Sequence, residues 1–146
     1  MSMRFHFVLF FLFFGIISNA QKQEVQKCIE IFFEGFHQRD SAKIKTVCAD
    51  KMILQSISEN SVKGNKLSNE STGAFYKAIA SIPLNMKFQE KILSYNIQVD
   101  GVMAHVWAPY EFYINDKLSH SGVNTFTLFK EKDNWKIIYL IDTRRK

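Results

Sequence analysis

The sequence has few features that identify a chemistry. It has only two cysteines, Cys28 and Cys48, and no spacing of histidine, cysteine and carboxylate residues that suits a metal, so we expect no metal site. It has no nucleophile elbow, phosphate-binding loop or zinc-helix motif, and nothing in it points to a cofactor. A basic stripe with interleaved aromatic residues is also missing, which argues against nucleic-acid binding. Internal repeats, low-complexity tracts and linkers are lacking, which predicts a single domain.

One apolar run stands at the N-terminus. Residues 7–17 are apolar apart from Gly15, follow Arg4, and precede the small-residue sequence Ser-Asn-Ala at 18–20. The run is shorter than the roughly 20 apolar residues that a bilayer-spanning helix needs. It predicts a signal peptide, residues 1–20, that is removed on export to the periplasm or the medium. Residues 21–146 then form one domain without membrane attachment. The net charge of +5 falls by one with the loss of Arg4.

The two cysteines allow two interpretations. Export to an oxidising compartment favours a disulfide between Cys28 and Cys48. Both residues also fall on the apolar faces of predicted helices, where a free cysteine behaves as a small buried hydrophobic residue. The sequence leaves both interpretations open.

Hydrophobic periodicity predicts three helices in the N-terminal half. The strongest covers residues 21–39, where apolar residues repeat at helical spacing. Asp40 or Ser41 is expected to cap a short second helix. Asn69 is expected to cap a third helix that ends before Pro83. A strand over residues 52–57 and a polar turn over residues 59–66 separate the second and third helices.

From Phe88 onward the period changes from 3.6 to 2. Asp100-Gly101 is a strong hairpin signal that joins predicted strands over residues 88–99 and 102–114. Turns at residues 115–116 and 131–134 lead into further strands over 118–130 and 135–142. The sequence therefore predicts an α+β domain in which three helices pack on a four-stranded antiparallel meander.

Two-residue turns assign residues to the two faces of this sheet. Under that assumption an apolar group lies on the face away from the helices, where solvent would not normally be expected to meet it. The group comprises Trp107, Phe126, Leu128, Ile137 and Tyr139. We expect a second copy of the chain to cover it, giving a homodimer. A bulge at Pro109 would turn the residues after it to the other face.

Three segments together resemble the nuclear transport factor 2-like superfamily. They are FFEGFHQRDSAKIKTVCADKMIL at 32–54, VDGVMAHVWAPYEFYIN at 99–115 and FTLFKEKDNWKIIYLIDTRRK at 126–146. Within the superfamily the chain is similar to small bacterial proteins labelled SnoaL-like or lumazine-binding-like. The resemblance covers nearly all of residues 25–142, and its most specific part is the final pair of strands.

The resemblance implies a curved sheet wrapped around a long helix, forming a cone with an apolar pocket, and dimers through the outer sheet face. The superfamily includes isomerases, dehydratases, polyketide cyclases, ligand carriers and assembly modules, so the fold does not select a function. Its enzymatic members use a pocket aspartate, often with a tyrosine or histidine. No such set matches this chain position by position, and none is carried over.

The residues themselves supply two acid–base candidates. Glu111 and His120 face each other if the turn at 115–116 has two residues, either as a general base with its orienting carboxylate or as a surface ion pair. Asp142, at the end of the last strand, is either a base at the rim of an apolar cavity or the partner of Arg144 or Arg145. A catalytic role for His37 is a weaker alternative to a cation that interacts with its helix dipole.

Tyr76, Tyr95 and Tyr110 are the expected ligand-binding residues, with ordinary core tyrosines as the alternative. The sequence therefore predicts an exported domain that binds a small organic molecule. Two other functions remain open. One is a cofactor-free enzyme that transfers protons, such as an isomerase, dehydratase or cyclase. The other is a structural module that binds a protein partner.

Overall fold

The computed structural model describes the backbone of residues 4–59, 62 and 64–145, and the side chains within those ranges from residue 19 onward. The side chains of residues 1–18, most of the predicted signal peptide, lie outside the described residues, so export stays a prediction. Over the described residues, no helix has the length and apolar character needed to cross a membrane.

The first helix, α1 (Arg4–Gln38), ends in a left-handed turn that starts the second. Arg39 has a φ of 59°, and the N–H of Asp40 donates to the carbonyl of Gly35 over 2.8 Å, as in a Schellman motif. The Asp40 carboxylate then accepts a hydrogen bond from the N–H of Lys43 and caps α2 (Ser41–Lys45). This confirms Asp40 as one of the two predicted caps.

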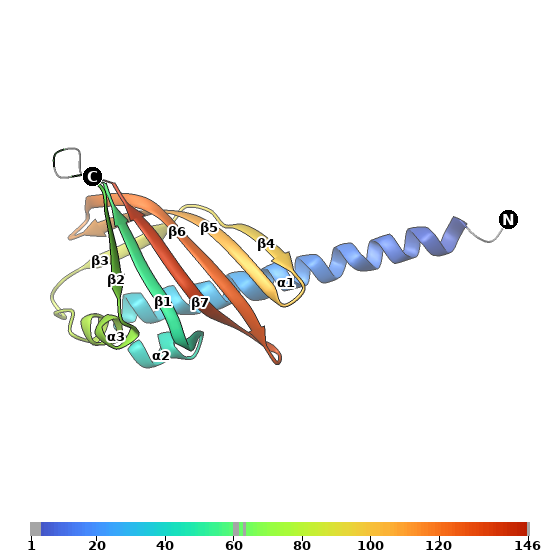
Figure 1. The fold of residues 1–146 in the computed structure, drawn as a ribbon, viewed down its shortest axis with the longest axis horizontal. Coiled ribbons are helices and arrows are strands. Elements are labelled where there is room, and N and C mark those ends of the chain that lie inside the picture. Colours follow the sequence, from blue (N-terminus) through green and yellow to red (C-terminus); the bar gives the residue numbers. More distant parts are fainter. Residues whose placement is uncertain (1–3, 60–61, 63, 146) are drawn as a thin grey trace.

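Seven strands and a third helix complete the domain, in the order of Figure 1. They are β1 (Cys48–Ser58), β2 (Lys66–Glu70), α3 (Thr72–Ala80), β3 (Phe88–Ile92), β4 (Asn96–Asp100), β5 (Met103–Ile114), β6 (Lys117–Glu131) and β7 (Asn134–Arg144). The sheet order is β2-β1-β7-β6-β5-β3, with β4 also paired to β5. β1 runs parallel to β7, and all other pairs are antiparallel. The predicted α+β class is confirmed, with a mixed sheet in place of the expected antiparallel one.

Two differences from the predicted elements have local causes. Residues 66–70 form strand β2 although they carry no alternating apolar pattern, so Ser71 caps α3 in place of the expected Asn69. The strand predicted over residues 88–99 is divided into β3 and β4. The break lies opposite Pro109, which has no N–H to donate to a neighbouring strand, and the N–H of Leu93 donates instead to the Pro109 carbonyl.

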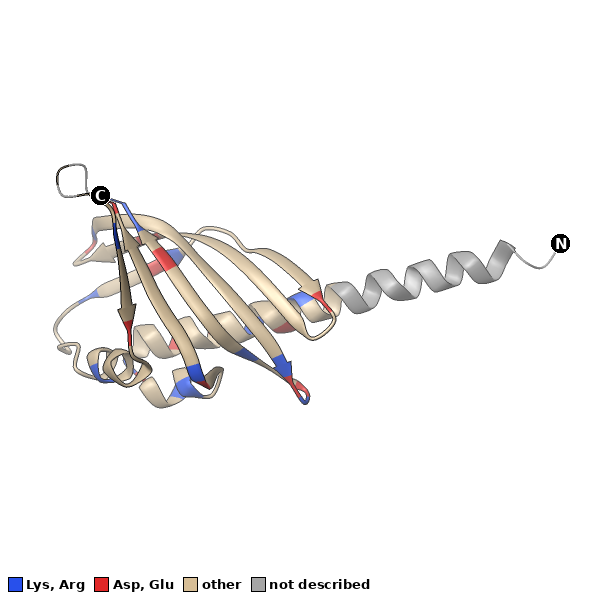
Figure 2. Ribbon diagram, viewed as in Figure 1, with Lys and Arg blue, Asp and Glu red and all other residues tan. Residues whose placement is uncertain are grey.

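The sheet curves around α1, while α2 and α3 lie together at one end of it (Figure 1). Phe32 of α1 is at the centre of the core. Its ring stacks on Phe75 of α3 at 6.0 Å between centroids and meets the edge of Phe126 of β6 at 5.9 Å. Charged residues are spread over helices, turns and strand ends among the described residues, without a stripe of one sign (Figure 2).

One extra residue in β6 decides which side chains face α1. The turn at residues 115–116 has two residues, as expected, because Ile114 pairs with Lys117. The register then shifts: Tyr113 pairs with Leu118, but Phe112 pairs with His120, which leaves Ser119 as a bulge. Because the side-chain period of a strand is 2, this bulge transfers every later residue of β6 to the other face.

The predicted dimer patch is wrong for three of its five residues. Phe126, Leu128 and Ile137 face the helices and are fully buried. Trp107 lies on the outer face with 50% of its surface exposed, and Tyr139 also faces outward, opposite Thr127. The cause is the bulge at Ser119 in place of the one considered at Pro109. The dimer itself stays a prediction.

The bulged segment brings two strands very close together at Gly122. A Cβ atom there would lie 1.7 Å from the Thr143 carbonyl oxygen and 2.8 Å from the Tyr110 ring. We expect Gly122→Ala to lower the free energy of unfolding by about 2 kcal/mol or more, because backbone must move to admit the methyl group. Urea denaturation measures the change.

Gly73→Ala is the matched control for this substitution. A Cβ atom at Gly73 has no atom within 4 Å, and the residue lies inside α3. We expect this variant to gain about 0.5–1 kcal/mol, because alanine restricts the unfolded chain more than glycine does. Equal stability of Gly122→Ala and wild type would show that β6 and β7 do not approach as described.

Candidate functional site

A cavity of about 470 Å³ opens between α1, α3 and the sheet. Its apolar part consists of Phe32, Phe33 and Phe36 of α1, Phe75 of α3, Leu54 of β1 and Leu140 of β7. Its polar part consists of Gln55, Ser56, Ser58, Ser68, Asn69, Glu70, Glu90, Asn124, Asp142 and Arg144. A site with a large apolar wall and a few grouped polar side chains is typical of small-molecule pockets.

Glu90 is the main titratable group of the cavity. Its Oε1 accepts a hydrogen bond of 2.6 Å from the Asn124 side-chain amide, and Asn124 is itself buried. Burial raises the pKa of Glu90 to about 7, and the nearby Asp142 adds to the rise, while Asn124 and Arg144 oppose it. Near neutral pH the carboxyl group is therefore present both with and without its proton.

His37 holds the backbone of the same residue. The N–H of Glu90 donates to His37 Nε2 over 3.0 Å. β3 ends the sheet, so this N–H lacks a strand partner and the histidine of α1 takes that place. Burial lowers the pKa of His37, which favours the neutral ring that can accept a hydrogen bond. The Nδ1 atom then carries the hydrogen.

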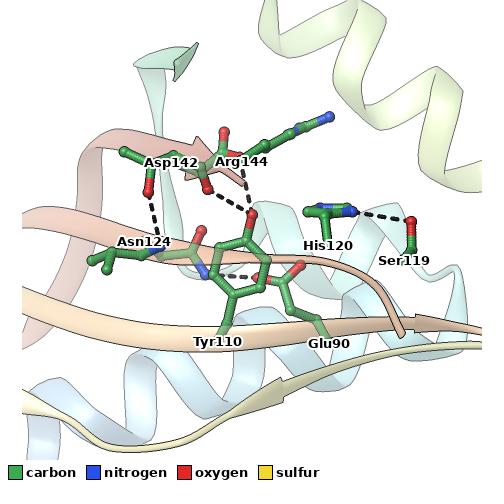
Figure 3. A network of polar contacts seen from close by, with 9 residues as sticks. Glu90, Tyr110, Ser119, His120, Asn124, Asp142 and Arg144 are labelled. Atoms are coloured by element: carbon green, nitrogen blue, oxygen red, sulfur yellow. Dashed lines mark hydrogen bonds and ion pairs between the residues drawn. The ribbon is translucent and has the colours of Figure 1, made fainter. Parts of the chain in front are cut away.

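Asp142, Arg144 and Tyr110 form the other half of the polar cluster (Figure 3). Arg144 Nε donates to Asp142 Oδ2 over 2.8 Å. The Tyr110 hydroxyl donates to the Thr143 carbonyl over 2.9 Å and lies 3.4 Å from Asp142 Oδ2. Burial, followed by the charges of Asp142 and Glu90, raises the pKa of Tyr110, so its hydroxyl remains a donor.

The predicted acid–base candidates differ in where the structure places them. Asp142 lines the cavity and also pairs with Arg144, so both interpretations made from sequence describe part of its position. Glu111 and His120 do not face each other, because the bulge pairs Glu111 with Ser121. Glu111 accepts a hydrogen bond from the Tyr113 hydroxyl over 2.8 Å.

His120 belongs to the face that also carries Phe112. Its ring stacks on Phe112 at 4.9 Å, and its Nδ1 lies 3.2 Å from the Ser119 hydroxyl. The expected Glu111–His120 pair is therefore wrong. His37, to which the sequence gave only a weak role, accepts a hydrogen bond from the backbone N–H of Glu90, the residue whose carboxyl group lines the cavity.

The three predicted tyrosines differ in their positions. Tyr110 reaches the polar cluster through its hydroxyl. Tyr76 lies on α3 beside Phe75, with the Lys45 ammonium 4.9 Å from its ring centre. Tyr95 packs against the core between β3 and β4. None of the three is among the residues that line the cavity.

The cysteines are free thiols in the structure, and both are buried. Cys28 donates to the Trp135 carbonyl over 3.3 Å. Burial raises the pKa of Cys28 to about 12 and that of Cys48 to about 11. A buried thiol that stays protonated is chemically inert. No group of three or more metal-binding side chains comes together among the described residues.

Sequence reasoning missed Glu90, Asn124 and Arg144. A signal for Glu90 existed, because it alternates in phase with the apolar residues Phe88 and Ile92 and must share their face. Asn124 gave no such signal, since its face depends on the bulge at Ser119. Arg144 was considered only as a partner for Asp142.

Comparison with known proteins supports the fold. No family profile matches the sequence, and no curated protein is significantly similar to it. Solved structures do match. An NTF2-like protein from Cytophaga hutchinsonii aligns with a TM-score of 0.68 at 14% identity, over 86% of this chain and 98% of that one.

Two further structures give the same result. A proposed dehydratase of the NTF2-like family from Streptomyces avermitilis aligns with a TM-score of 0.66 at 15% identity, over 88% of this chain and 98% of that one. An NTF2-like protein of unknown function from Shewanella baltica aligns with a TM-score of 0.64 at 15% identity, over 87% and 95%. The chain has the nuclear transport factor 2-like fold, as its resemblance predicted.

The raised pKa of Glu90 has a consequence for stability. The folded protein keeps a proton on Glu90 up to about pH 7, whereas the unfolded chain releases it near 4.5. The contribution of protonated Glu90 to the free energy of unfolding is therefore complete below pH 4.5. It is lost as the pH rises through 7, and the loss is at most about 3 kcal/mol. Glu90→Gln keeps the acceptor for Asn124 and removes this loss.

Urea denaturation at pH 5, 7 and 9 tests this expectation. Relative to wild type, Glu90→Gln should gain stability as the pH rises, and the gain should be largest at pH 9. Burial lowers the pKa of His37, so His37 makes the protein less stable as the pH falls. This contribution is the same in both proteins and cancels in the comparison. Glu111→Gln, on the outer face of the sheet, is the control substitution. If the free energy of unfolding changed with pH in the same way for wild type and Glu90→Gln, the result would contradict the raised pKa of Glu90.

Proposed function

We propose that this chain is an exported protein that binds a small organic molecule in the cavity between α1, α3 and the sheet. The observation that carries the proposal is the cavity itself, about 470 Å³ with an aromatic wall and one polar end. Its volume lies within the range of roughly 300–1,000 Å³ typical of small-molecule sites. A structural module would not need such a space, because filling it with side chains would stabilise the fold.

Native mass spectrometry of residues 21–146, purified from the exported fraction, tests the proposal. We expect a small molecule to co-purify with the wild-type domain. Ser56→Trp should abolish the adduct, because Ser56 lines the cavity and an indole there fills much of it. Ser94→Trp is the control, since Ser94 is exposed between β3 and β4. An adduct that survives Ser56→Trp would place the ligand elsewhere.

Proton-transfer catalysis is the second function that a specific observation favours. Glu90 has a pKa of about 7 in the cavity, which suits a general acid or base near neutral pH. The Asn124 amide, which also lines the cavity, donates a hydrogen bond to this carboxyl group. The proposed dehydratase among the structural neighbours is consistent with such chemistry on this fold. A co-purified ligand that wild type converts and Glu90→Gln does not would support it.

We also propose a homodimer through the outer sheet face, with corrected residues. The exposed apolar side chains of this face include Ile53, Met103, Trp107 and Phe129, each at least 43% exposed. Met103 pairs with Phe129, and Ile53 lies beside Tyr139, so these side chains share one surface. Apolar surface of this kind marks interfaces. Sedimentation of residues 21–146 as a monomer at micromolar concentration would contradict the dimer.

A further inference from the structure

We propose that the ligand of the cavity is an apolar amine, bound as its ammonium cation with the charged nitrogen at Glu90 and the hydrocarbon body against the phenylalanines of α1 and α3. This inference rests on the proposed function, that the cavity binds a small molecule.

The charged residues that line the cavity are mostly acidic. Glu70, Glu90 and Asp142 supply three carboxyl groups, and Arg144 is the one basic residue among the described lining residues. Arg144 is bonded to Asp142 through its Nε atom, and in Figure 3 its guanidinium group points away from Asn124. The pair of Asp142 and Arg144 therefore carries no net charge, and the Arg144 charge, which also acts on Glu90, is shared between two carboxyl groups.

The polar end of the cavity also has more acceptors than donors. Glu90 Oε1 is occupied by the Asn124 amide, and no described residue donates to Glu90 Oε2. Because the Asn124 amide nitrogen points to Glu90, its carbonyl oxygen is a further acceptor. Asp142 Oδ2 takes the hydrogen bond of Arg144, which leaves Oδ1. An ammonium group has three N–H donors and no acceptor, which matches this set.

The apolar wall suits a cation with a hydrocarbon body. Phe32, Phe33, Phe36 and Phe75 all line the cavity. The face of a phenyl ring attracts a cation, and the ring covers hydrocarbon at the same time. A carboxylate ligand would meet the like charge of Glu90 and Asp142 instead. The combination of aromatic rings and an excess of carboxyl groups over basic groups selects a positively charged amphipathic molecule.

Protonation of Glu90 gives the proposal a measurable signature. An ammonium group favours the carboxylate form, so binding should release a proton from Glu90 below about pH 7, and affinity should rise with pH. A ligand carbonyl would favour the protonated form and show the opposite trend. The polar and titratable groups on the same face as Glu90 are Asn124 and His120 from β6, Tyr110 from β5, Asp142 and Arg144 from β7, and His37 from α1.

Isothermal titration calorimetry with three matched probes tests the proposal on residues 21–146. The probes are 2-(2-naphthyl)ethylamine, 2-(2-naphthyl)ethanol and 2-naphthylacetate, which share one ring system and differ in charge. At pH 8 we expect the amine to bind at least about tenfold more tightly than the alcohol, with the acid weakest. The preference should shrink several-fold at pH 5.5. Titrations in two buffers of different ionisation enthalpy should detect proton release near pH 6.5.

Two variants separate the inference from the proposed function. Glu90→Gln should remove the preference for the amine while the alcohol still binds, and Glu111→Gln should change neither. Equal affinity for amine and alcohol in wild type, or an amine preference that survives in Glu90→Gln, overturns the inference. If Ser56→Trp then abolishes alcohol binding, the cavity still binds a small molecule, and the proposed function stands although the inference of an amine ligand fails. If no probe binds at millimolar concentration, both fail.

Discussion

The register of β6 against β5 is the constraint on which the rest of the structure depends. The bulge at Ser119 turns Phe126 and Leu128 toward α1, where they complete the core. The same shift turns Asn124 inward, where its amide reaches Glu90. Without the extra residue the sheet would present its large apolar side chains to solvent and would have no buried amide beside the cavity. The inserted residue thus places both the β6 side chains that pack in the core and the amide that binds Glu90, while a second bulge at Ile138 of β7 turns Asp142 inward.

Glu90 is held at the edge of the sheet by contacts from two other elements. His37 of α1 accepts the hydrogen bond of its N–H, and Asn124 of β6 donates to its carboxyl group. Burying a carboxyl group opposes folding unless it is protonated or paired. An apolar residue at this position would pack against Phe88 and Ile92 without that cost. The fold therefore tolerates a destabilising group at the polar end of its cavity, which is common where a site binds or transforms a ligand.

Much of the fold was predictable, because it depends on local patterns. The apolar periodicity of α1, the Asp40 cap and the strands of the last hairpins all follow from nearby residues, and the resemblance predicted the cone. The bulge at Ser119 was not predictable, since no glycine or proline marks it. β2 has no apolar alternation and exists through its pairing with β1. The prediction of the site was wrong because the predicted register of β6 was wrong. Counting from the turn pairs Glu111 with His120, whereas the bulged residue pairs Glu111 with Ser121.

The pKa of the Glu90 carboxyl group tests the account most directly, since both the cavity and the register must be right for it to be raised. Titration of the folded domain, residues 21–146, by ¹³C NMR of the glutamate side-chain carboxyl carbons measures it, with Glu90→Gln used to assign the signal. We expect a midpoint at about 7. A midpoint near the ordinary value of 4.5 would show that Glu90 lies in water, and would contradict the buried polar end of the cavity on which the proposed function and the ligand class are based.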